Sequence, residues 1–62
     1  MWTGILMSDN LENIILLKDN LKILNILTRV RKFLGEKGVF YKVLVPRAEL
    51  NEALNLIIDL NL

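Results

Sequence analysis

The segment that decides the fold is NLKILNILTRVRKFLGEKG, residues 20–38, because it permits two different structures. As a helix over residues 20–34, it gathers its apolar side chains within one half of the helical circumference, and only Arg31 interrupts them. Asp19 or Asn20 can cap the start of this helix, and Gly35 can cap its end. The periodicity therefore predicts a helix over residues 20–34.

The flanking segments complete a fold around this helix. Extending it backwards would bring Glu12 onto the apolar face, so residues 12–18 are better explained as a short buried strand. Residues 39–45 are rich in β-branched and aromatic side chains and predict a strand that ends at Pro46. Residues 47–60 have a second helical period, while residues 1–7 are ambiguous. We expect one α/β or α+β domain over residues 1–62, with a two- to three-stranded sheet, both helices on one face and the order β-α-β-α.

The same segment supports an alternative fold. Asp9 and Glu12 have the spacing of a capping box, which would start a helix at Asn10 and continue it over residues 10–19. Residues 24–34 would then pair with residues 39–45 as a hairpin across the turn at residues 35–38. The order becomes β-α-β-β-α, of the ferredoxin-like or ACT-like type.

The composition predicts self-association. The chain has 62 residues, of which 53% are hydrophobic, and a domain of this size has little interior in which to bury them. Exposed contiguous apolar surface usually marks an interface, so we expect a homo-oligomer. In the helix over residues 47–60, Leu50, Ala53 and Ile57 belong to the apolar stripe, and Leu56 lies opposite it. The candidate interface residues are Phe33, Phe40, Leu44, Leu56, Leu60 and Leu62.

The residue inventory argues against catalysis. The chain contains neither His nor Cys, which removes the commonest general base, the thiol nucleophile and most ligands of transition metals. Its only serine, Ser8, lacks a nucleophile-elbow motif, and no two carboxylates form a recognisable catalytic pair. We therefore expect no enzyme activity, no cofactor and no metal.

Neither a membrane span nor a signal peptide is predicted. The longest aliphatic run, residues 14–17, is far shorter than the roughly 20 residues that cross a bilayer. The N-terminal residues carry no basic region of the kind that begins a signal peptide. We expect a cytoplasmic protein that does not bind membranes.

The charge is unevenly distributed, although its net value is only +1. All eight Lys and Arg residues lie between Lys18 and Arg47, where only Asp19 and Glu36 oppose them. A basic segment of this kind is typical of contacts to nucleic acid or another anion. The candidate contacts are Lys18, Lys22, Arg29, Arg31, Lys32 and Lys42.

The two folds place these cations differently. With a helix over residues 20–34, four of the basic side chains line its outer surface, where they could follow a phosphate backbone: Lys18, Lys22, Arg29 and Lys32. In the hairpin, three of them share one sheet face with two phenylalanines: Arg29, Arg31, Lys42, Phe33 and Phe40. Aromatic and basic side chains interleaved on an open sheet are a layout that stacks single-stranded bases.

Residues 12–58 resemble the first half of a two-component receiver domain. Residues 12–20, ENIILLKDN, are similar to the family's first strand and acidic turn, and residues 52–54 match the Glu-Ala-Leu often found in its second helix. The family's acidic pair binds magnesium, but here the first position is Lys18, which opposes metal binding. The strand that would carry the phosphoacceptor is not within these residues. The resemblance therefore implies a β-α-β-α arrangement without phosphotransfer.

Together these observations predict a small non-catalytic interaction or regulatory module that self-associates through apolar surface. The first alternative is an anion- or nucleic-acid-binding protein that uses the basic residues between Lys18 and Arg47. The second is an accessory subunit of a larger complex.

Overall fold

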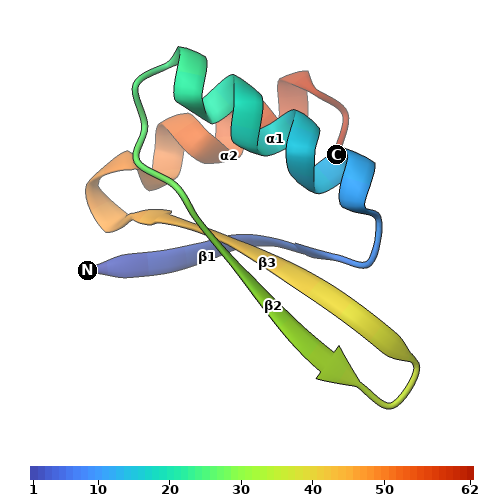
Figure 1. The fold of residues 1–62 in the computed structure, drawn as a ribbon. Helices are drawn as coiled ribbons and strands as arrows, with labels where there is room; N and C mark the ends of the chain where they lie inside the picture. Colours follow the sequence, from blue (N-terminus) through green and yellow to red (C-terminus); the bar gives the residue numbers. More distant parts are fainter.

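The computed structural model describes all 62 residues, which form three strands and two helices (Figure 1). The elements are β1 (Trp2–Ser8), α1 (Leu11–Ile23), β2 (Arg29–Gly35), β3 (Gly38–Pro46) and α2 (Leu50–Asp59), with a 3-10 turn over Arg47–Glu49. The fold is a small α+β domain whose order, β-α-β-β-α, is that of the hairpin alternative. The expected helix over residues 20–34, and with it the β-α-β-α order, is wrong.

The start of α1 is set by an asparagine cap. The side-chain oxygen of Asn10 accepts a hydrogen bond from the backbone N–H of Asn13 at 3.2 Å. The backbone N–H of Asn10 in turn donates to the Ser8 hydroxyl at 3.0 Å. Because this cap satisfies a donor that the first turn would leave without a partner, it stabilises a helix at this point. Residues 12–18 are accordingly helical, and the strand expected there is wrong.

The end of α1 explains why no helix covers residues 20–34. Asn25 adopts a left-handed conformation with φ of 61°, which reverses the chain direction. Its N–H donates to the Lys22 carbonyl, and the Ile26 N–H donates to the Leu21 carbonyl, both at 3.0 Å. These two bonds form a Schellman motif, in which the buried side chains of Leu21 and Ile26 also belong to one core cluster. The chain therefore leaves the helix at Ile23, eleven residues before the end that the periodicity predicted.

The sheet is antiparallel, with β3 in its centre and the order β1-β3-β2. The hairpin between β2 and β3 closes at the Gly35–Gly38 pair, so its loop has two residues. Gly38 has φ of +127°, a conformation that residues with a Cβ rarely adopt. The expected strand over residues 39–45 is confirmed. It pairs with β2, which lies largely within residues 24–34, the segment that the hairpin alternative paired with it.

Both helices pack on the same face of the sheet (Figure 1). The core between the layers consists of seven fully buried residues: Ile14, Leu17, Leu21, Ile26, Val43, Val45 and Ala53. A bulge in β1 between Gly4 and Leu6 changes the alternation of the strand, so that both Ile5 and Leu6 pack against this core.

The apolar stripe of α2 differs from the predicted one. Ala53 is its fully buried centre, and its neighbours one turn on, Leu56 and Ile57, pack against the core. Leu56 is therefore not on the outer side of the helix, as expected. Ile58 is 73% exposed instead, and Leu54 is also exposed.

The strand β2 is covered on neither face. Each of its residues is exposed, and in Figure 1 the hairpin extends beyond the helices. Neither α1 nor α2 has the length and apolarity required of a membrane-crossing helix.

Candidate nucleic-acid interface

One face of the sheet has no element packed on it. Along β3, Val43 and Val45 are buried beneath the helices, so Lys42 and Leu44, which alternate with them, point to the other side. Directly paired residues of neighbouring strands share a face, and the register therefore identifies the rest of this surface. We call it the open sheet face; it comprises Trp2, Gly4, Met7, Arg29, Arg31, Phe33, Phe40, Lys42, Leu44 and Pro46.

The open sheet face carries three cations and no carboxylate. Arg29 and Arg31 come from β2, and Lys42, which pairs with Arg31, comes from β3. The seven Asp and Glu residues all lie in the helices, at their ends or in turns, and none lies in a strand. The field above this face is therefore positive, whatever the small net charge of the whole chain.

Three aromatic rings accompany the cations. Phe33 and Phe40 form a direct cross-strand pair beside the hairpin turn, and Phe33 is 38% exposed. Trp2 lies at the opposite end of the sheet, where it pairs with Pro46. Phe40 and Pro46 are six positions apart on β3, which corresponds to roughly 20 Å along the strand. The rings thus mark the two ends of a strip whose middle is occupied by Arg31 and Lys42.

Trp2 is already in contact with a cation. The guanidinium carbon of Arg29 lies 4.2 Å from the centroid of the Trp2 ring. A cation at this distance above an indole is attracted by the quadrupole of the ring, an interaction of about 0.5–1 kcal/mol at an exposed site. Arg29 therefore shields one side of the indole in the free protein.

Two glycines make room for side chains of this surface. A Cβ atom at Gly35 would lie 2.9 Å from the Phe40 ring, so the ring rests directly on the backbone of β2. A Cβ atom at Gly4 would likewise clash with the Lys42 side chain. Because both positions lack a side chain, Phe40 and Lys42 lie flat across the sheet instead of standing away from it.

The structure brings together five of the residues that the hairpin alternative placed on one face: Arg29, Arg31, Phe33, Phe40 and Lys42. Lys32 points to the helix side of β2, because it pairs with Tyr41, which packs against the core. Lys18 and Lys22 lie on α1, in the other layer. The six cations proposed as one set therefore occupy two separate surfaces.

The proposed interface residues also divide between two places. Phe33, Phe40 and Leu44 lie on the open sheet face, whereas Leu56, Leu60 and Leu62 pack against the core of the same chain. Trp2 and Met7 were missed because residues 1–7 gave no clear strand pattern. The signal that could have placed them is Trp2 itself, an aromatic residue at the start of a β-branched and aliphatic run.

The structure contains no group of three or more His, Cys, Asp or Glu residues that could hold a metal ion. No protein-family model matches the chain, and no curated protein or solved structure is significantly similar to it.

Proposed function

We propose that this chain is a non-catalytic binding module that holds single-stranded nucleic acid on the open sheet face. The observation that carries the proposal is the combination on one uncovered surface of three aromatic rings, three cations and no carboxylate. Aromatic rings give a stacking surface to any base, and the cations pair with the phosphates between them.

The geometry favours a single strand over a duplex. In a duplex the bases stack on one another and present only their edges, so flat aromatic side chains find no partner there. No helix projects from the open sheet face to enter a groove (Figure 1). Unpaired bases can instead stack on Phe33 and Phe40, while Arg31 and Lys42 contact the backbone.

The first test is binding of a labelled single-stranded oligonucleotide of about eight nucleotides, a length within the range that small sheet domains cover. With three phosphate contacts, the logarithm of the affinity should fall with the logarithm of the salt concentration at a slope of about −2. Between about 50 and 200 mM salt this is a loss of roughly 20-fold. A duplex of the same sequence should bind more weakly. Absence of single-strand binding even at low salt contradicts the proposal.

Two neighbouring residues provide a matched control for the charge. Arg31 and Lys32 are adjacent on β2, are both exposed and point to opposite sides of the sheet. Arg31→Gln should reduce the salt slope by about 0.7, whereas Lys32→Gln, which removes the same charge from the other face, should leave it unchanged. Equal effects of the two substitutions would show that only net charge matters.

A second pair of neighbours tests stacking. Phe33→Leu should weaken binding by about 5- to 150-fold, the effect of losing one stacked base, without changing the salt slope. The control is Leu34→Ala, because Leu34 is more exposed than Phe33 but lies on the helix side. If both variants bind as the parent does, the aromatic surface has another use.

The second candidate function is self-association, and the outer edge of β1 favours it. Strand β1 has one unpaired edge and contains no charged residue, whereas β2, at the other edge, contains three cations that would repel a second copy. An uncharged edge strand is a template for pairing with another chain. Light scattering after gel filtration should then show an oligomer at low and high salt. Met7→Lys on β1 should shift it toward the monomer, and Leu34→Lys on β2 should not.

A further inference from the structure

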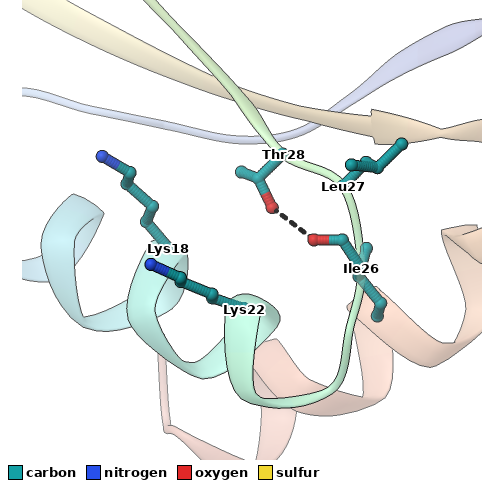
Figure 2. A pocket seen from close by; sticks show the side chains of 5 residues that line it. All are labelled: Lys18, Lys22, Ile26, Leu27 and Thr28. Atoms are coloured by element: carbon teal, nitrogen blue, oxygen red, sulfur yellow. Dashed lines mark hydrogen bonds between the residues drawn. The ribbon is translucent and has the colours of Figure 1, made fainter.

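A pocket separate from the open sheet face lies between α1 and the segment that leads into β2. Figure 2 shows its five lining residues, Lys18, Lys22, Ile26, Leu27 and Thr28. Its volume is about 200 Å³, below the 300–1,000 Å³ typical of sites for drug-sized ligands. The pocket can therefore hold a small organic molecule but not a nucleotide strand.

Two like charges line this pocket without a carboxylate among them. Lys18 and Lys22 are one helical turn apart on α1, and both side chains extend to the same side of the helix (Figure 2). Like charges at this spacing destabilise a helix, and an anion between them would remove the repulsion. Lys22 also lies in the last turn of α1, where the negative end of the helix dipole stabilises the lysine and opposes an anion, so the two lysines must supply the attraction for a bound anion.

The opposite wall is apolar. Ile26 is buried in the core and fixes the position of the segment, while Leu27 is 71% exposed beside it. The Thr28 hydroxyl donates its hydrogen to the Ile26 carbonyl at 3.1 Å. It therefore has no hydrogen left for an anion, and the two lysines are the only side-chain donors that line the site.

We propose that this pocket binds a small phosphate monoester, with its phosphate between the two lysines and its apolar body against Leu27. The charges match, because a phosphate monoester carries between one and two negative charges at neutral pH and the pocket offers two positive ones. The apolar wall distinguishes such a ligand from inorganic phosphate. The site is independent of the nucleic-acid proposal, since none of its residues belongs to the open sheet face.

The experiment is a titration of the isotope-labelled protein with phenyl phosphate, followed by backbone NMR. Saturable shifts should be confined to Lys18, Lys22 and residues 26–28. Inorganic phosphate, which lacks the apolar body, and benzyl alcohol, which lacks the charge, should each bind more weakly. Equal affinity for inorganic phosphate, or shifts centred on the open sheet face, would overturn the proposal.

Three glutamine variants complete the test. Lys18→Gln and Lys22→Gln should each weaken phenyl phosphate binding by about two- to five-fold, the range expected for an exposed ion pair. Lys32→Gln removes an exposed cation from outside the pocket and should leave the affinity unchanged. Because Gln and Lys have similar helix propensities, α1 should persist in both pocket variants, which the NMR spectra report directly. Unchanged affinity in both pocket variants would exclude the site.

Discussion

Val43 and Val45 on one side of β3 are fully buried beneath two helices, whereas Phe40, Lys42 and Leu44 on the other side of the same strand have no element above them. The fully buried residues on the covered side are apolar, as close packing requires. The open side holds aromatic rings and cations that the core does not use. One strand therefore serves stability with one set of alternating residues and presents a binding surface with the other.

The largest expected effect tests the covered side through two adjacent leucines. Leu17 is fully buried, and its replacement by alanine should cost about 2–5 kcal/mol because a cavity remains. Leu16→Ala, at a site that is 42% exposed, should cost far less. Chemical denaturation measures both free energies of unfolding. Since a domain of this size has a total stability of roughly 3–9 kcal/mol, Leu17→Ala should leave it marginal. Similar losses in both variants would mean that α1 does not pack as described.

A smaller effect is expected at the hairpin turn, which the pair Gly35 and Gly38 closes. Gly38→Ala places a Cβ at a φ of +127° and should cost about 1–3 kcal/mol through backbone strain. Gly35→Ala should cost less stability, because the Phe40 ring that lies 2.9 Å from the new atom can move. It should nevertheless weaken single-strand binding, since it displaces that ring. If Gly35→Ala binds single-stranded nucleic acid as the parent does, the position of the Phe40 ring has no part in binding.

Strands β3 and β2 also differ in how far the sequence predicted them. The strand over residues 39–45 was predicted because its β-branched and aromatic residues favour a strand and Pro46 ends it, although the sequence did not indicate which side would be buried. The segment over residues 29–34 was assigned to a strand only in the alternative fold, because β2 is exposed on both faces and has no apolar alternation to detect. Its apolar residues, Val30, Phe33 and Leu34, happened to continue the helical period of the apolar residues before them. Without a buried face, periodicity carries little information about secondary structure.

The predicted end of the helix was wrong for a different reason. Asn25 ends α1 by adopting a left-handed conformation, and asparagine is the residue other than glycine that does so most readily. The helical wheel treats Asn25 as an ordinary polar position on the outer face. The same arrangement ends α2, where Asn61 has φ of 62° and the Leu62 N–H donates to the Ile57 carbonyl. An asparagine followed by an apolar residue occurs at both ends, but the same pair also occurs inside the helices, at Asn13–Ile14 and Asn55–Leu56, so this pattern alone does not locate a helix end.

The candidate site was predictable only as far as the hairpin was. Once residues 24–34 pair with residues 39–45, strand alternation places Arg31, Phe33 and Lys42 together without further information. Trp2 required the pairing of β1 with β3, which joins residues between 33 and 44 positions apart and leaves no local pattern. Long-range strand pairing is the part of this fold that a single sequence constrains least.

The smallest expected effect concerns the contact between Arg29 and Trp2, in which the guanidinium covers one side of the indole ring. Arg29→Gln removes the cation above Trp2 and should lower the free energy of unfolding by no more than about 1 kcal/mol. Trp2 is the only tryptophan, so its fluorescence reports this change without a label. Arg31→Gln removes the same charge from the same face, but Arg31 makes no stacking contact with the indole. This substitution should therefore leave the emission unchanged. If a base replaces Arg29 on the ring when nucleic acid binds, an oligonucleotide should alter Trp2 emission in the parent protein, and the response should persist in Arg29→Gln. Emission that responds to nucleic acid in neither protein would confine binding to the Phe33–Phe40 end of the sheet.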